Sequence, residues 1–142
     1  MFQRILVPVD GTARSERAVP YALGLAQSLG AEAIVCRILT TPLVPHSAAE
    51  EQDAAEYVGR IGERFRAASV AAKAIVRRGD ASREIRHAAI EWGADAIVMA
   101  TRARRPLDKL VLGSVADVIV RESQLPVLLV SAQRAKRLKR SA

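Results

Sequence analysis

The sequence predicts an α/β fold in which a five-stranded, mostly parallel sheet carries helices on both faces. Short apolar runs, typical of strands buried on both faces, alternate along the chain with segments whose apolar residues recur at helical spacing. Strands that are separated by helices imply right-handed crossovers and parallel pairing. The 142 residues, half of them apolar, are enough for one domain with a full core.

The first part of the chain supplies a strand, a helix and a second strand. The apolar run at residues 5–9 predicts the first strand, and apolar positions within residues 18–29 recur at helical spacing. Gly30 marks the end of that helix, because glycine readily adopts the left-handed conformation that closes helices. Residues 33–39 predict the second strand. They include the single cysteine, Cys36, which excludes a disulfide framework and favours a buried thiol in a reducing, intracellular setting.

The rest of the chain continues the alternation of helix and strand. Asp80 is expected to help start a helix, because its carboxylate can accept hydrogen bonds from the free N–H groups there. Residues 1–132 are predicted to form a single domain and residues 133–142 a basic tail. The remaining predicted elements are a long helix at 47–68, a strand at 70–77, a helix at 82–92, a strand at 94–100, a helix at 114–123 and a strand at 126–130.

The expected strand order brings two distant segments together. In the common order 3-2-1-4-5, ligands bind outside the carboxyl ends of the strands, at the point between strands one and four where the order reverses. Residues 8–12 and 99–114 follow these two strands. We therefore expect them to face each other across a crevice.

The charge of the chain is concentrated at its end. Of the formal net charge of +7, five positive charges lie in residues 133–142, which leaves +2 for the rest. Such a tail either adds salt-sensitive attraction to phosphates and anionic surfaces or is simply solvated. Two Phe, two Tyr and one Trp give little material for stacking bases, so specific nucleic-acid binding is not expected. No apolar stretch approaches the roughly 18 residues of a membrane span, so a soluble cytoplasmic protein without a membrane role is predicted.

Two stretches resemble the universal stress protein family. "RILVPVDGTARSERAV" at residues 4–19 is similar to the family's opening strand, aspartate and first helix. "GADAIVMATRARRPLDKLVLGSVADVIVRESQLPVLLV" at residues 93–130 is similar to its closing half in register and spacing. The resemblance spans residues 2–130 and implies a Rossmann-like fold of the adenine nucleotide alpha hydrolase-like kind, with strand order 3-2-1-4-5.

The resemblance also points to a phosphate loop that has lost glycines. In the nucleotide-binding members of the family, this loop reads G-x-x-G, nine residues, then G-S or G-T. Here the same register gives Ala100 and Ala103, nine residues after Ala103, then Gly113 and Ser114, so the spacing survives but two of three glycines do not. An alanine forced into a left-handed conformation would cost about 1–2 kcal/mol, whereas in an ordinary conformation it adds only crowding.

The resemblance implies a nucleotide site at the crevice. Asp10 would meet the ribose or adenine side, with Val9 and Ile38 shaping an apolar slot; Asp10 also suits a turn, and both roles can hold at once. Ser114 and Asp117 have capping-box-like spacing, which predicts that Ser114 caps a helix whose N-terminus faces the crevice. The predicted nucleotide-binding residues are Pro8, Val9, Asp10, Ile38, Met99, Ala100, Thr101, Arg102, Ala103, Gly113, Ser114 and Val115.

Charges within the loop also suit an anion. Arg102, Arg104, Arg105 and Lys109 contribute four positive charges against one negative charge from Asp108. These side chains either attract phosphate and partly replace the lost backbone approach, or are merely solvated.

Signatures of catalysis are missing from the sequence. His46 and His87 have no cysteine or second close histidine that would make a metal set. No Ser-His-Asp order, G-x-S-x-G elbow or G-x-x-x-x-G-K-[ST] loop occurs, and the H-x-G-H and S-G-G-x-D-S signatures of nucleotidyl transfer are also missing. The chain is predicted not to be an enzyme, although slow ATP hydrolysis stays open.

Three functions therefore stay open. The first is a stress-response or regulatory domain that weakly binds ATP, with Mg²⁺, or a related adenine nucleotide. The second is a dimeric scaffold of the same fold with a vacant crevice, and a more remote third is an enzyme acting on a phosphorylated metabolite. A homodimer is expected for the first two, because the apolar strand at residues 127–130 comes late in the chain and suits an edge that a second subunit covers.

Overall fold

A parallel sheet of five strands forms the middle of the structure, a computed structural model that describes residues 2–40, 45–101 and 112–131. The strand order is β3-β2-β1-β4-β5, and every pairing is parallel, which confirms the predicted order. The strands are β1 (Arg4–Pro8), β2 (Glu32–Leu39), β3 (Ala72–Arg78), β4 (Ala96–Thr101) and β5 (Val127–Ser131).

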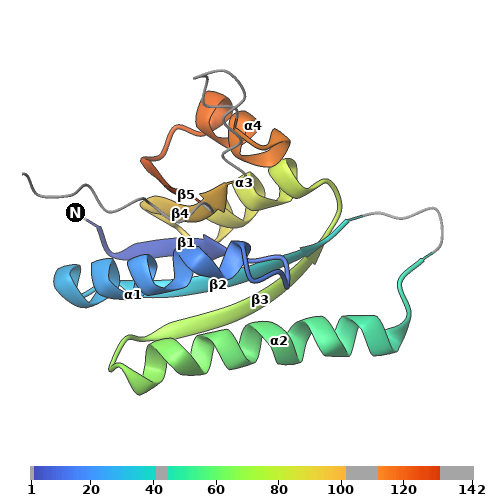
Figure 1. Ribbon diagram of the computed structural model, residues 1–142, viewed down its shortest axis with the longest axis horizontal. Coiled ribbons are helices and arrows are strands. Elements are labelled where there is room, and N and C mark those ends of the chain that lie inside the picture. The colour runs from blue at the N-terminus through green and yellow to red at the C-terminus, as the bar shows by residue number, and fades with distance from the viewer. Residues whose placement is uncertain (1, 41–44, 102–111, 132–142) are drawn as a thin grey trace, which may run out of the picture.

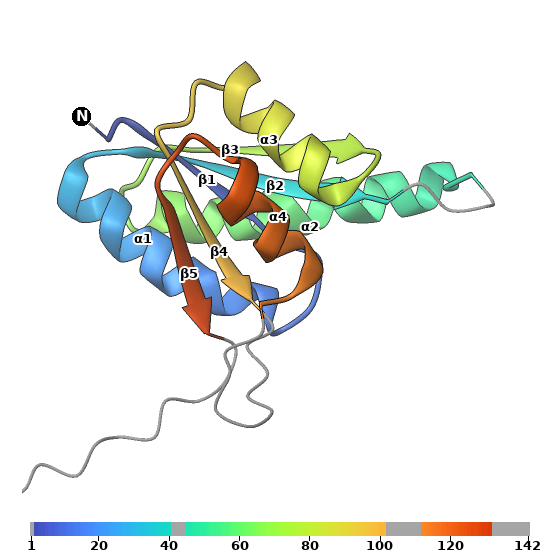
Figure 2. The same ribbon diagram turned by 90° about the horizontal axis from the view of Figure 1, so that it is seen from above.

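Four helices cover the two faces of this sheet. The helices α1 and α2 pack on one face, while α3 and α4 pack on the other (Figure 1). Seen from above, α3 and α4 lie side by side over the sheet (Figure 2), and the two helices are in contact. Their bounds are α1 (Ala18–Leu29), α2 (Ala48–Ala67), α3 (Ala81–Glu91) and α4 (Ser114–Glu122), and a short 3-10 turn η1 (Ser15–Arg17) precedes α1.

The central strand β1 shows why the sheet is apolar on both faces. Ile5 and Val7 point into the core under α1 and α2, and Leu6 points into the core under α3 and α4. All three side chains are 0% exposed. Burial of such a side chain stabilises the fold by about 1.5–3 kcal/mol. Because successive side chains of β1 point to opposite faces, this strand contributes to both helix–sheet cores.

The helix boundaries follow local chemistry that the sequence indicates. Asp80 accepts hydrogen bonds from the Arg83 N–H at 3.1 Å and the Ser82 hydroxyl at 2.8 Å, which confirms its predicted role at the start of α3. These bonds hold the pKa of the Asp80 carboxyl below its ordinary value. Gly30 closes α1 with φ of 65°, also as predicted.

Two predicted strands begin two residues later than expected. The third begins at Ala72 rather than residue 70, because Ser69 adopts φ of 62° and the Val70 N–H donates to the Phe65 carbonyl to close α2. The fourth begins at Ala96 rather than residue 94, because the Asp95 carboxylate accepts from backbone N–H groups at the start of β1.

The predicted helix cap at Ser114 is wrong. Gly113 is the N-cap of α4, with extended backbone (φ −61°, ψ 158°), and no side chain caps the helix. Ser114 is instead the first helical residue, so its hydroxyl lies one position too far into the helix to cap it. The N-terminus of α4 is therefore left without a side-chain cap.

Two further predictions concern single features. Cys36 is completely buried, as expected, and burial raises the pKa of its thiol to about 12. Among the described residues, no helix combines the length and apolarity needed to cross a membrane. The basic tail at residues 133–142 lies outside the part of the chain that the structure describes.

Candidate functional site

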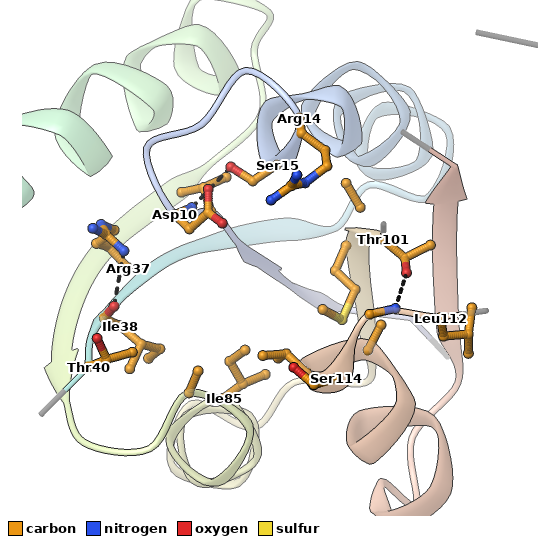
Figure 3. Close-up of a pocket in the computed structure, with 17 residues that line it drawn as sticks. Asp10, Arg14, Ser15, Arg37, Ile38, Thr40, Ile85, Thr101, Leu112 and Ser114 are labelled. Carbon is orange, nitrogen blue, oxygen red and sulfur yellow. Dashed lines mark hydrogen bonds between the residues drawn. The ribbon is translucent and has the colours of Figure 1, made fainter. Parts of the chain in front are cut away.

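A cleft of about 520 Å³ opens at the carboxyl ends of β1, β2 and β4 (Figure 3). Its volume falls within the range of about 300–1,000 Å³ typical of small-molecule sites. The loop that leads from β1 into η1 forms one wall, and α3 with the first turn of α4 forms the other walls. This is the switch point of the strand order, where the sequence predicts a crevice.

Nine of the twelve predicted site residues line this cleft. They are Val9, Asp10, Ile38, Met99, Ala100, Thr101, Gly113, Ser114 and Val115. Pro8, the last residue of β1, is buried and is not among the lining residues. Arg102 and Ala103, together with the other loop charges Arg104, Arg105, Asp108 and Lys109, lie outside the described residues.

The loop after β1 is held by its own hydrogen bonds. The Asp10 Oδ1 atom accepts from the Thr12 N–H at 2.9 Å and from the Thr12 hydroxyl at 2.5 Å, and the Ser15 hydroxyl accepts from the Asp10 N–H at 3.0 Å. Gly11 allows this tight turn because its φ is +86°, a value that other residues rarely adopt. The turn-forming role considered for Asp10 is therefore present, and the same carboxylate lines the cleft.

Asp10 stays ionised because of these contacts. Its partial burial raises the pKa, but the Thr12 hydrogen bonds, the Ser15 hydroxyl and the positive charge of Arg37 outweigh burial and lower the pKa below its ordinary value. The side chain thus presents an anionic acceptor at the cleft wall. Such an acceptor suits the hydroxyl groups of a sugar.

A second layer of contacts ties this loop to α2. The Tyr57 hydroxyl donates to the Glu16 carboxylate at 3.0 Å, and Arg64 pairs with the same carboxylate at 3.5 Å. Burial, followed by the hydrogen bond to Glu16, raises the pKa of Tyr57 to about 12. The wall that carries Asp10 is therefore fixed from within the loop and from the neighbouring helix.

The opposite wall brings the N-terminus of α4 to the cleft. Ser114, Val115 and Ala116 line the cleft, and the first N–H groups of a helix have no acceptor inside that helix. The preceding Gly113 N–H donates to the Thr101 hydroxyl at 3.3 Å, which joins the ends of β4 and α4. Free N–H groups and the positive end of the helix dipole suit a phosphate.

Ala100, the first of the two replaced loop glycines, lies in ordinary backbone. It belongs to β4 and pairs with Val130 of β5, and the only described non-glycine residue with positive φ is Ser69. Alanine at position 100 therefore carries no left-handed strain, and only the crowding by its methyl group remains. The corresponding question for Ala103 falls outside the described residues.

The floor of the cleft is apolar. Val9, Ile38 and Met99 are between 3% and 6% exposed, and Ile85 of α3 closes the floor at 4%. Val9 and Ile38, the two residues of the predicted apolar slot, both line the cleft. Such a floor can hold a planar heterocycle by dispersion and by exclusion of water.

Several lining residues escaped the sequence analysis. Arg37 was signalled by a charge inside an otherwise apolar strand, and Arg14 by its place four residues after Asp10. The remainder have no sequence signal, because only the packing of α3, α4 and β2 around the cleft brings them there; they are Ser15, Thr40, Ala81, Ile85, Leu112 and Ala116.

The two histidines lie outside the cleft lining. The His46 Nδ1 atom lies 2.6 Å from the Glu50 carboxylate and its Nε2 atom 2.7 Å from the Thr40 carbonyl, so this side chain links the end of β2 to the start of α2. These hydrogen bonds, the Thr40 carbonyl first, raise the pKa of His46. His87 lies 3.8 Å from Glu84 on the same helix.

Comparison with known sequences gives a consistent match. A sequence model of the Universal stress protein family matches residues 1–131. A universal stress protein of Thermus aquaticus is 33% identical, over 92% of this chain and 99% of its own length.

Solved structures show the same fold. A universal stress protein solved in complex with cAMP has a TM-score of 0.75 at 22% identity, and the match covers 93% of this chain and 98% of that one. A universal stress protein from Archaeoglobus fulgidus, solved in complex with dAMP, has a TM-score of 0.71 at 21% identity and covers 90% and 97% of the two chains.

Proposed function

Because this chain belongs to the universal stress protein family, we propose that its cleft binds an adenine nucleotide and that the protein acts as a stress-response or regulatory domain. The related proteins solved with cAMP and dAMP support the choice of an adenine nucleotide. We expect the binding to be weak, because alanines stand at positions 100 and 103, where the nucleotide-binding pattern has glycines.

One observation carries the proposal. The cleft combines an apolar floor, an ionised aspartate and a helix N-terminus, and these three features match the base, the sugar and the phosphate of a nucleotide. Val9 and Ile38 would contact the base, Asp10 the ribose hydroxyls, and the N–H groups of Ser114 and Val115 the phosphate.

The specific ligand in this proposal is ATP bound together with Mg²⁺. No group of three or more His, Cys, Asp or Glu side chains within residues 2–40, 45–101 and 112–131 is arranged to hold a metal ion. We therefore expect Mg²⁺ to be held mainly by the phosphates of ATP, where it would balance their charge. The protein is proposed to bind nucleotide and report its state without efficient chemistry, in the cytoplasm.

A vacant scaffold is the second candidate. It is favoured by the Thr101 hydroxyl, which already occupies the Gly113 N–H, and by the methyl group of Ala100 at the cleft. Both features take away backbone donors or space that a phosphate would use.

Bound nucleotide separates these candidates. Absorbance and mass spectrometry of the denatured protein would detect nucleotide carried through purification, and thermal unfolding with 1 mM ATP and Mg²⁺ would detect added ligand. A dissociation constant near 10 μM stabilises by roughly 2.7 kcal/mol at that concentration, which is several degrees for a domain of this size. No carried nucleotide and no shift would favour the scaffold.

A homodimer through β5 is part of either candidate. The strand lies at one edge of the sheet, and Leu128 is 45% exposed there, whereas Leu129 packs against the core of α3 and α4. An apolar edge strand is suited to cover by a second copy. Light scattering should give a mass near twice 15.3 kDa, and Leu128→Glu should lower it, while a monomeric parent would remove this part of the proposal.

A further inference from the structure

The cleft contains an arginine that pairs with no acid among the described residues. Arg14 lies in the loop between β1 and η1, is half-buried, and lines the cleft. Figure 3 shows its side chain extending from the loop toward the open middle of the cleft. Within the described residues, no hydrogen bond or ion pair holds its guanidinium group.

Two other half-buried arginines, Arg77 and Arg86, have acidic partners. Arg77 contacts Glu84 at 3.0 Å and also pairs with Glu91, and Arg86 contacts Glu122 at 2.9 Å. Partly buried charges are usually paired, because removal from water costs free energy that a counter-ion offsets. Arg14 therefore differs from Arg77 and Arg86 in leaving its charge available to a ligand.

Arg37, the other arginine in the cleft lining, is already engaged. Its guanidinium donates to the Ile38 carbonyl at 3.1 Å, and its charge helps to lower the pKa of Asp10. Asp10, the one acid in the described lining, accepts both hydrogen bonds from Thr12. Of the three charged groups in the described lining, only Arg14 thus has a side chain without a described protein contact to compete with an entering anion.

The loop also places Arg14 with little freedom in its backbone. Ser15 on one side bonds to Asp10 and Thr12, and the Arg14 carbonyl accepts from the Arg17 N–H at 3.2 Å. The guanidinium therefore extends from a fixed base. A preorganised arginine loses less entropy when it binds a phosphate than one on a mobile loop.

We propose that Arg14 binds the phosphate group of the nucleotide and makes the cleft select a nucleotide over the uncharged nucleoside. This inference rests on the proposed function. The guanidinium would supply a charge-assisted, bidentate contact that compensates for the glycines replaced in the loop after β4. The free N–H groups of α4 would bind the same phosphate from the opposite wall.

The test compares AMP with adenosine by calorimetry, using the full chain and two variants. In Arg14→Gln, AMP should bind about 10- to 100-fold more weakly, as expected for loss of a charge-assisted hydrogen bond, and adenosine affinity should change less than twofold. Arg60→Gln is the matched control, because Arg60 is exposed on α2 and outside the cleft lining, so it removes the same charge without effect on AMP. Arg14→Lys should recover part of the AMP affinity.

Two results would overturn the inference. One is unchanged AMP affinity in Arg14→Gln, and the other is an equal loss for AMP and adenosine, which would indicate damage to the cleft as a whole. Circular dichroism and thermal unfolding of each variant establish that it is folded.

Inorganic pyrophosphate separates this inference from the proposed function. If the parent binds neither AMP nor adenosine, the proposed function fails. Thermal stabilisation by pyrophosphate that Arg14→Gln removes and Arg60→Gln keeps would then support Arg14 as an anion-binding residue. Absence of such stabilisation in the parent would overturn both proposals.

Discussion

The two main walls of the cleft are built in different ways. The loop after β1 carries its own hydrogen bonds between residues 10, 12 and 15, and Tyr57 and Arg64 of α2 hold the adjoining Glu16. The wall at β4 and α4 joins residues that are twelve apart in sequence through one bond of 3.3 Å between Gly113 and Thr101. The first wall is therefore held by contacts between residues close in sequence. The shape of the second wall depends on how the end of β4 and the start of α4 pack together.

This difference separates stability from affinity. Changes in the loop after β1 should weaken the fold and the nucleotide site together, because the same groups serve both. Changes at the β4 end should cost the fold less and act mainly on the space and the N–H donors offered to phosphate.

The largest effect is expected from Asp10→Ala. It removes both acceptor contacts to Thr12 and the anionic group at the cleft, so stability in urea should fall by about 1–2 kcal/mol and nucleotide affinity by about 100-fold. Asp53→Ala on α2 is the control, because this exposed acid lies outside the cleft lining. Equal behaviour of the two variants would show that the loop is not organised by Asp10.

Gly11→Ala should come next. Its φ of +86° is costly for alanine, so stability should fall by about 1–2 kcal/mol, measured as a lower thermal midpoint. Gly59→Ala is the matched control, because a Cβ there, in α2, meets open space and should stabilise the helix by about 0.5–1 kcal/mol. A Gly11→Ala variant as stable as the parent would contradict the rigid-loop account.

Ala100→Gly should have a smaller effect. Residue 100 is extended in β4, so glycine relieves no strain, and its flexibility should cost about 0.5–1 kcal/mol of stability. Affinity for ATP, measured by calorimetry, should rise less than about threefold. A tenfold gain from this single change would mean that the methyl group itself blocks the ligand; a gain confined to the double variant with Ala103→Gly would be due to position 103.

The smallest effect is the dependence of stability on pH in acid. The pKa of Asp10 is lowered in the folded state, so its carboxylate adds stability that is fully present above its unfolded pKa of about 3.9 and is lost as pH falls through the lower folded value. The stability difference between the parent and Asp10→Asn in urea should be constant from about pH 5 to 8 and shrink below about pH 4. A difference that grows in acid would contradict the sign of this shift.

The strand order and most of the cleft could be predicted, because they depend on patterns formed by residues that are close together in the sequence. Apolar runs and helical spacing place the strands and helices, and the order of a parallel sheet brings the ends of β1 and β4 together. Gly30 and Asp80 mark helix ends through their own backbone or side chain, and the structure confirms both.

The remaining features depend on backbone geometry and tertiary contact. Ser114 has the spacing of a cap, but the helix begins at that residue, and a boundary one position away changes which residue is the cap. Whether Ala100 is strained depends on its dihedral angles. The place of Arg14 four residues after Asp10 indicates that it is near the cleft, but whether its side chain lines the cleft depends on how the loop that leads into η1 folds.

Calorimetric titration of the parent with AMP and with ATP and Mg²⁺ tests the central claim most directly. Binding in the cleft predicts saturable heat at one nucleotide per chain, a dissociation constant between about 1 μM and 1 mM, and loss of that heat in Asp10→Ala. No heat and no thermal stabilisation with either nucleotide at millimolar concentration, in a protein whose circular dichroism shows that it is folded, would contradict a nucleotide function and leave the vacant scaffold.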